Sequence, residues 1–146
     1  MTDRQPQLTA EDLRGMLPEW LPEASNLRLE AVGPMTATAR AIVGKDQLRP
    51  GGTVSGPTQF GLADFAFYAA VLAMIGREPM TVTTNLSLDF MRAPAPKDLI
   101  AEARILKLGR RLAFGDVIMH SDGDPTPVSR ASVTYAIPSS TPSPRR

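Results

Sequence analysis

The segment of residues 60–75, FGLADFAFYAAVLAMI, is the most apolar stretch of the chain, and Asp64 is its only charged residue. A helix that is apolar on nearly every side has to be covered on more than one side, by its own domain or by a partner. A carboxylate buried alone in such surroundings is costly. The segment therefore predicts a central helix, with Asp64 either pointing out through a gap in the packing or retained for chemistry.

Pro57 and Gly76 mark the expected ends of this helix. Proline suits the first helical position because an N–H there would have no intrahelical acceptor, so Gly56 is the expected N-cap. Glycine suits the position just after a helix. A membrane span needs about 20 apolar residues. Because this stretch is shorter and holds Asp64, a buried core helix is favoured over a membrane helix.

The composition of the chain excludes several classes of function. The net charge of +1 and the aromatic content of 5% offer no basic field and few stacking side chains, so neither nucleic acid nor membrane is expected as a partner. The chain has no cysteine, which excludes disulfides and thiolate catalysis. Its one histidine, His120, excludes a histidine-rich zinc site and is expected to face solvent at a strand end. We expect no metal and no cofactor.

The 146 residues are expected to form one domain with short extensions. Residues 1–26 form an N-terminal helical segment, whose helix begins at a Thr9–Asp12 capping box and breaks at Pro18. Residues 27–138 form the main domain, and residues 139–146 are a tail that is expected to be disordered. Because the first residues contain no apolar stretch of the signal-peptide kind, we expect a cytoplasmic location.

Strand patterns flank the central helix. Residues 27–43 have the pattern of strands with an interruption at Gly33 and Pro34. After the helix, residues 81–91 alternate with a period of two, which places Thr83 and Asn85 on the polar face of a half-buried strand. Three further stretches follow, LIAEARILKL, RLAFGDVIMH and VSRASVTYAI, and their short turns imply antiparallel hairpins. We predict an α+β domain in which one antiparallel sheet covers one helix.

Three stretches of the chain resemble a known family. They are SGPTQFGLADFAFYAAV, TTNLSLDFMRAP and DLIAEARILKLGRRLAFGDVIM, in that order. They are similar to acyl-CoA thioesterases of the hotdog fold, in the phenylacetate-degradation (PaaI-like) branch, over about residues 27–138. The resemblance implies a hotdog fold, a curved antiparallel β-sheet wrapped around one long central α-helix. It also implies hydrolysis of an acyl-CoA thioester to a carboxylic acid and free coenzyme A.

The resemblance gives Asp64 a catalytic role. In this branch an acidic residue of the central helix acts on the thioester as nucleophile or general base, and both routes stay open. A backbone N–H of the family's His-Gly-Gly motif binds the thioester oxygen. The family spacing between that glycine and the acid, eight residues, selects Gly56, so Ser55, Gly56 and Pro57 occupy the motif. Ser55 and Pro57 depart from the family pattern, and Pro57 has no N–H to donate.

Other residues are predicted to contact the substrate. Gly61 opens space beside Asp64, and Tyr68 offers a hydroxyl that either holds the carboxylate or a water, or lies at the edge of the core. Thr83 and Asn85 are candidate contacts from the polar strand face. For the phosphates of coenzyme A, the resemblance points to arginines, whose planar fork suits phosphate. The predicted substrate-binding residues are Ser55, Pro57, Gly61, Tyr68, Asn85, Arg92, Gly109, Arg110 and Arg111.

The resemblance also implies an assembly. Hotdog subunits pair with their sheets edge to edge, and each site takes the glycine from one subunit and the acid from the other. We therefore expect a homodimer, doubled to a dimer of dimers. Two other functions are considered. A non-catalytic protein that binds acyl-CoA or acyl groups is favoured by the absent motif histidine and by Pro57, whereas a hotdog dehydratase is disfavoured because no histidine lies near the helix.

Overall fold

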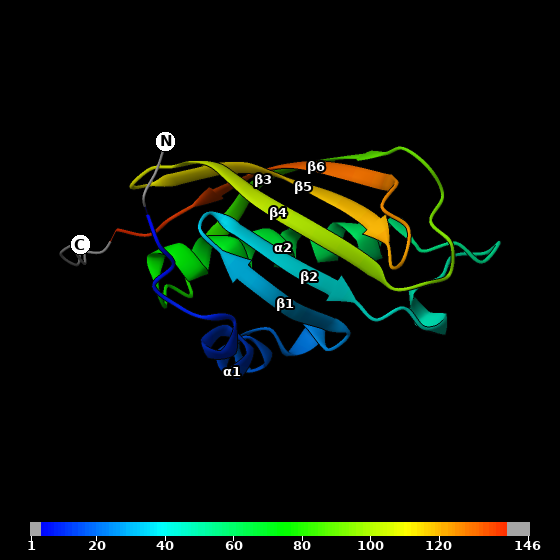
Figure 1. The fold of residues 1–146 in the computed structure, drawn as a ribbon, viewed down its shortest axis with the longest axis horizontal. Coiled ribbons are helices and arrows are strands. Elements are labelled where there is room, and N and C mark those ends of the chain that lie inside the picture. The colour runs from blue at the N-terminus through cyan, green and yellow to red at the C-terminus, as the bar shows by residue number, and fades with distance from the viewer. Residues whose placement is uncertain (1–3, 140–146) are drawn as a thin grey trace, which may run out of the picture.

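The computed structural model describes residues 4–139 and shows one antiparallel sheet wrapped around one long helix (Figure 1). The strands are β1 (Leu27–Gly33), β2 (Thr36–Ala41), β3 (Val82–Phe90), β4 (Leu99–Leu108), β5 (Leu112–Ser121) and β6 (Pro127–Ala136). They lie in the order β1-β2-β4-β5-β6-β3, and all neighbours are antiparallel. This arrangement confirms the predicted hotdog fold. The predicted tail lies outside the described residues, apart from Ser139.

The core is built around helix α2 (Gly56–Ile75), which packs on the inner face of the sheet. Small side chains such as Ala63, Ala66 and Ala69 are fully buried and let the strands approach closely. Within the described residues, α2 is the one helix long and apolar enough to cross a membrane. However, 72% of its most apolar stretch is buried inside the domain, which is the behaviour of a core helix.

The N-terminus of α2 differs from the prediction by one residue. Ser55, not Gly56, is the N-cap, because its backbone is extended and its Oγ accepts a hydrogen bond from the Thr58 N–H at 3.3 Å. Serine caps a helix well because its side-chain oxygen replaces a missing acceptor, and glycine has no such oxygen. Gly56 is therefore the first helical residue and Pro57 the second. Gly76 follows the helix as expected, with a φ of 98°.

Helix α1 (Ala10–Trp20) begins as predicted and ends later. The Thr9–Asp12 capping box is present, with hydrogen bonds of 2.9 and 3.0 Å. The predicted break at Pro18 is wrong, because the helix continues through it to Trp20. Proline removes one backbone hydrogen bond, and packing of the buried face outweighs that loss. The buried face consists of Leu13, Met16 and Leu17.

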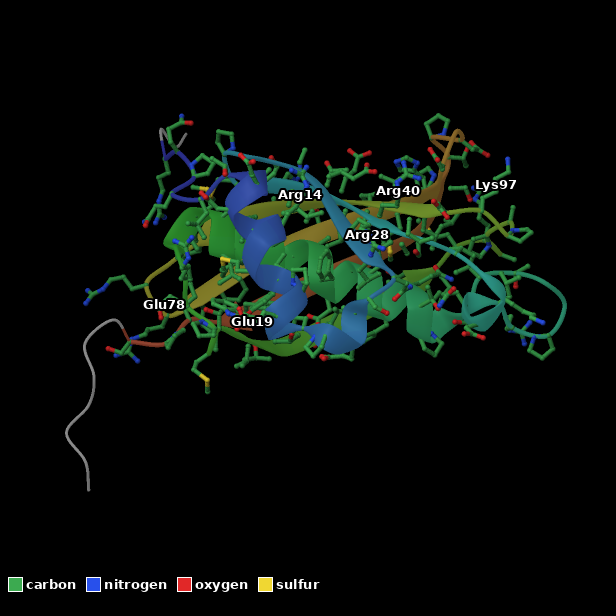
Figure 2. The ribbon with its side chains drawn as sticks, turned by 90° about the horizontal axis from the view of Figure 1, so that it is seen from below. Arg14, Glu19, Arg28, Arg40, Glu78 and Lys97 are labelled. Atoms are coloured by element: carbon green, nitrogen blue, oxygen red, sulfur yellow. The ribbon has the colours of Figure 1, made fainter. Side chains whose placement is uncertain are left out.

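The two edges of the sheet differ in what covers them. Helix α1 lies beside β1, and Arg14 extends from this helix toward the edge strand (Figure 2). Arg14 Nε donates to the Leu29 carbonyl at 2.9 Å, and Nη2 donates to the Glu30 carbonyl at 2.7 Å. Two acceptors that an added strand would need are therefore already occupied. At the opposite edge, β3 pairs with β6 on one side and has no strand on its outer side among residues 4–139.

Strand β3 contains a β-bulge that the regular alternation of the sequence did not reveal. Thr83 pairs with Tyr135 and Asn85 pairs with Thr134, so Thr84 is an extra residue without a partner. An extra residue reverses the faces of the strand on one side of it. Thr83 therefore faces α2, while Asn85 is exposed on the outer face. The prediction that Thr83 and Asn85 share one polar face is wrong.

Replacing Gly115 by alanine tests how closely α2 and β5 pack. A Cβ at this position would overlap the backbone oxygen of Arg104 and the ring of Phe67. We expect Gly115→Ala to lower the free energy of unfolding by about 1–3 kcal/mol, measured by urea denaturation. The matched control is Gly15→Ala in α1, where no atom lies within 4 Å of the added Cβ. It is expected to gain up to about 1 kcal/mol. Unchanged stability of Gly115→Ala would contradict this packing.

Candidate active site

The side chain of Asp64 lines a cavity at the edge of the sheet. The cavity measures about 590 Å³, and Gly61, Asp64, Phe65 and Tyr68 line it from α2. Gly61 lies three and four residues before Asp64 and Phe65, and Tyr68 lies four and three residues after them, so the four share one face of the helix. Asp64 is half-buried and not enclosed. The one charge of the apolar helix therefore points out through a gap in the packing, as one of the two sequence-based alternatives required.

Two other parts of the chain complete the cavity. Thr81, Thr83 and Tyr135 line it from the sheet side, and residues of the short helix η1 (Pro22–Ala24) and the start of β1 also line it. The hydroxyl of Thr81 is buried and has no hydrogen-bond partner among the described residues. Buried polar groups in proteins are nearly always paired, so we expect a water or a polar ligand atom to bind this hydroxyl.

Two hydroxyl groups of the sheet hold the Asp64 carboxylate. Thr83 Oγ1 donates a hydrogen bond to Asp64 Oδ1 at 2.6 Å. Tyr135 Oη donates to the same oxygen at 2.6 Å and lies 3.0 Å from the backbone oxygen of Asp64. Hydrogen bonds to an ionised acceptor are shorter and stronger than neutral ones. Asp64 is thus fixed from β3 and β6 at once.

Tyr135 was not predicted as a site residue, although the sequence carried a signal for it. Ala131, Val133 and Tyr135 alternate along β6, so they share the face that has to cover α2. A tyrosine on that face must find a partner for its hydroxyl. Thr83 was a candidate contact only as part of a polar face. Its inward direction depends on the bulge, which the sequence pattern did not reveal.

Tyr68 does not hold the Asp64 carboxylate. Its hydroxyl donates to the backbone oxygen of Pro79 at 3.3 Å, and its ring lies 6.0 Å from the ring of Tyr135. Tyr68 nevertheless lines the Asp64 cavity. The hydrogen bond to the carboxylate that was one alternative for Tyr68 is made by Tyr135 instead.

The pKa of Tyr135 is raised well above its ordinary value. Burial of the phenol is the main cause, and the negative charge of Asp64 beside it adds to the effect. Both causes disfavour the tyrosinate form. Tyr135 therefore remains protonated and stays a hydrogen-bond donor to Asp64 throughout the neutral and mildly alkaline range.

The first turn of α2 leaves one backbone donor free. The Thr58 N–H is bound by Ser55 Oγ, the Gln59 N–H donates to the Ser55 carbonyl at 3.2 Å, and Pro57 has no N–H. The Gly56 N–H has no acceptor among the described residues. A Cβ at Gly56 would lie 3.3 Å from the Phe90 ring, so the absence of a side chain permits a close approach.

Gly56 and Asp64 of one chain do not meet. They are eight residues apart on the same helix, and a rise of 1.5 Å per residue separates them by about 12 Å along the axis. A thioester carbonyl is far smaller than this distance. The two groups therefore cannot act on one carbonyl unless they come from different chains.

The remaining predicted contacts lie in several places within one chain. Arg92 follows β3, and its Nε donates to the Pro127 carbonyl at 3.0 Å. Gly109, Arg110 and Arg111 form the β4–β5 turn beside the C-terminal end of α2, where they line a separate cavity of about 420 Å³. Asn85 is exposed on the outer face of the sheet, away from the Asp64 cavity. The structure therefore brings Pro57, Gly61, Tyr68 and Asp64 together, but not these five.

A larger cavity of about 760 Å³ lies between α1 and β1. It shares Leu21, Ala24, Leu27 and Phe65 with the Asp64 cavity. Three arginines, Arg14, Arg28 and Arg40, are also among its lining residues (Figure 2). No residue of α2 other than Phe65 lines it. Helix α2 therefore offers this larger cavity no carboxylate, whereas it offers Asp64 to the smaller one.

No group of His, Asp and Glu suited to a metal ion occurs among residues 4–139. His120 lies on β5, and its Nε2 is 3.0 Å from Glu102 of β4. Its Nδ1 is 3.1 Å from the Ser121 carbonyl. Neither contact involves α2 or the Asp64 cavity. Within the described part of one chain, therefore, no histidine contacts the Asp64 carboxylate.

Comparison with known proteins gives the family. The sequence profile of the thioesterase superfamily matches residues 51–128, which is more than half of the chain. The chain belongs to the thioesterase superfamily. This membership supports the hydrolysis of thioesters in general, and the matched region contains both Gly56 and Asp64.

Solved structures agree with this family. A candidate thioesterase from Silicibacter sp. TM1040 is 47% identical, with 91% of this chain and 94% of that one covered and a TM-score of 0.85. A mutant of the phenylacetic acid degradation protein PaaI from Thermus thermophilus is 25% identical, with 82% and 99% covered and a TM-score of 0.69. Zebra fish thioesterase superfamily member 2 shares the fold, at 19% identity, with 90% and 100% covered and a TM-score of 0.80. No curated protein sequence matches. The predicted relationship to PaaI-like thioesterases is confirmed.

Tyr135 should make the stability of the protein sensitive to alkaline pH. The unfolded chain loses the phenolic proton near pH 10, whereas the folded chain keeps it because the folded pKa is raised. The free energy of unfolding then falls as the pH rises above about 10, by about 1.4 kcal/mol per pH unit for one group. We expect urea denaturation between about pH 9 and pH 11.5 to show a shallower fall for Tyr135→Phe than for wild type. Equal slopes would contradict this environment of Tyr135.

Proposed function

We propose that this thioesterase superfamily member hydrolyses an acyl-CoA thioester to a carboxylic acid and free coenzyme A, with Asp64 as the reacting carboxylate. The observation that carries the proposal is the position of Asp64. It is the only charged residue of α2, yet it lies in the wall of a cavity of about 590 Å³ and is held there by Thr83 and Tyr135. Apolar neighbours such as Phe65 supply a wall for an acyl group.

Two routes through Asp64 fit this geometry. As a nucleophile, its carboxylate attacks the carbonyl carbon, the C–S bond breaks, coenzyme A leaves as thiolate, and water then hydrolyses the mixed anhydride. As a general base, Asp64 accepts a proton from water while the water oxygen attacks the same carbon. Both routes put negative charge on the carbonyl oxygen in the transition state.

We propose the Gly56 N–H as the donor that stabilises this oxygen. It is the one first-turn N–H of α2 that has no acceptor among the described residues, and it lies at the positive end of the helix dipole. Pro57 has no N–H of its own. The Thr58 N–H is satisfied by Ser55 Oγ, and the Gly56 N–H stays available to the substrate. The departures at Ser55 and Pro57 are therefore compatible with an active site.

The distance between Gly56 and Asp64 leads us to propose a homodimer in which each site takes Gly56 from one chain and Asp64 from the other. The β3 edge is the candidate for pairing, because no strand lies on its outer side among the described residues, whereas Arg14 occupies acceptors of the β1 edge. Large apolar side chains are exposed along and beside β3. They are Phe60, Met80, Val82, Phe90 and Met91. A dimer of dimers remains a prediction.

The phosphates of coenzyme A are proposed to contact Arg92 or the Gly109–Arg111 turn of one of the two chains. The side chains of Arg92, Arg110 and Arg111 are exposed, and their guanidinium groups suit phosphate oxygens. Asn85 has no proposed contact, since it is exposed on the outer face. No metal or cofactor is proposed, and a cytoplasmic location remains the expectation.

Replacement of Asp64 tests the proposed reaction. Purified protein is assayed on short, medium and aryl acyl-CoAs by release of free thiol. Asp64→Asn keeps the shape of the side chain and removes the negative charge, so we expect kcat to fall by at least about 1,000-fold. The matched control is Asp116→Asn, which neutralises a carboxylate that pairs with Arg104 on the sheet surface.

Three outcomes of this assay are distinguishable. Hydrolysis by wild type and by Asp116→Asn, with loss in Asp64→Asn, supports the proposal. Undiminished hydrolysis by Asp64→Asn would remove Asp64 from the mechanism. Tight binding of acyl-CoA by wild type without any turnover across the panel would instead support the non-catalytic binding protein.

Charge introduced at the β3 edge tests the two-chain site. The double variant Val82→Glu/Met91→Glu places like charges where two β3 strands would meet, which opposes their pairing. We expect wild type to sediment as a dimer or larger and the double variant to sediment as a monomer with little hydrolysis. The control is Ile42→Glu, which changes an exposed apolar residue beyond β2. A monomeric wild type with full activity would contradict the shared site.

A further inference from the structure

Both hydroxyl groups that bind Asp64 bind the same oxygen. Thr83 Oγ1 and Tyr135 Oη each lie 2.6 Å from Oδ1. Oδ2 has no hydrogen-bond partner among the described residues. The two oxygens of one carboxylate therefore have different environments, one bound twice by the sheet and the other left for a ligand or water.

We propose that Tyr135 is a positioning residue that, together with Thr83, holds Asp64 through Oδ1 and leaves Oδ2 as the oxygen that reacts. The inference rests on the proposed thioester hydrolysis and specifies its reacting atom. Oδ2 then either attacks the thioester carbonyl carbon or accepts the proton of the attacking water. In both routes the hydroxyl protons stay on Tyr135 and Thr83.

The surroundings of Tyr135 suit a positioning role. Its ring lies between Phe67 and Tyr68, with ring centroids 5.4 and 6.0 Å away. On β6 it pairs with Ala113 of β5 and with Thr83 of β3, so strands on both sides fix its backbone. A buried ring with neighbouring strands on both sides has little freedom to move. Its hydroxyl therefore fixes the direction of the carboxylate more firmly than a loop residue would.

The bulge in β3 brings the second hydroxyl to the same oxygen. If Thr84 were paired regularly and not bulged, the alternation of side chains would place Thr83 on the outer face together with Asn85. Two donors on one oxygen restrict rotation of the carboxylate plane, which one donor alone would allow. A reacting group held in a fixed direction gains rate because less orientational freedom has to be lost in the transition state.

The test compares Tyr135→Phe with wild type on an acyl-CoA that wild type hydrolyses. The variant keeps the ring and its packing and removes only the hydroxyl. We expect kcat to fall on the order of 10- to 100-fold, with KM within about twofold, because the carboxylate loses its direction and the cavity keeps its shape. Thr83→Val is expected to show the same pattern, so the proposal does not depend on a single variant.

Two comparisons separate positioning from other roles. Ser132→Ala removes a hydroxyl from the exposed outer face of β6 and should leave kcat unchanged. In the Asp64→Asn background, Tyr135→Phe should cause no further loss, because a residue that acts through Asp64 has nothing left to position. Tyr68→Phe, which alters the cavity wall, is expected to change KM rather than kcat.

Each outcome has a defined meaning. Wild-type kcat in both Tyr135→Phe and Thr83→Val, with Asp64→Asn inactive, would overturn the positioning role and leave the proposed function intact. A further loss from Tyr135→Phe in the Asp64→Asn background would show that Tyr135 acts on the substrate directly, which also overturns it. Absence of thioester hydrolysis by wild type would instead overturn the proposed function itself.

Discussion

The structure depends on the need to cover a helix that is apolar on nearly every side. One sheet of six strands wraps α2, and the fully buried alanines of the helix allow the strands to come close. The cover is incomplete along the face that carries Gly61, Asp64 and Tyr68, where a cavity opens. The same face holds the only charge of the helix, so the candidate reactive carboxylate lies where the packing is open. Core packing and the proposed chemistry therefore share the same helix.

The sheet does more than exclude water from α2. Its β3–β6 pair carries two hydroxyls to one oxygen of Asp64, and a single extra residue at Thr84 is what turns Thr83 inward. Because β6 is paired on both sides at Tyr135, one of the two donors to the carboxylate comes from an interior strand of the sheet. A site built on paired strands keeps its geometry better than one built on loops.

The parts of the structure that the sequence predicted are those that depend on regular periods. The order of strands and helix, the capping box at Thr9 and the end of α2 at Gly76 all follow from such patterns. The bulge at Thr84 broke the period of two, so the direction of Thr83 was missed. Tyr135 was missed because its partner lies 71 positions away in the chain, and Tyr68, four residues from Asp64, was considered in its place. Long-range pairing is invisible to local pattern.

The position of Arg14 has a consequence for how far the protein can assemble. A sheet with two free edges can add copies at both sides and grow without limit into fibres. Here the guanidinium of Arg14 occupies the carbonyls of Leu29 and Glu30, and α1 lies along that side. The opposite edge is left for pairing, and in the proposed dimer the pairing of two identical β3 strands would use up the free edge of both chains. One arginine on a short N-terminal helix would thus make the proposed edge-to-edge association self-limiting.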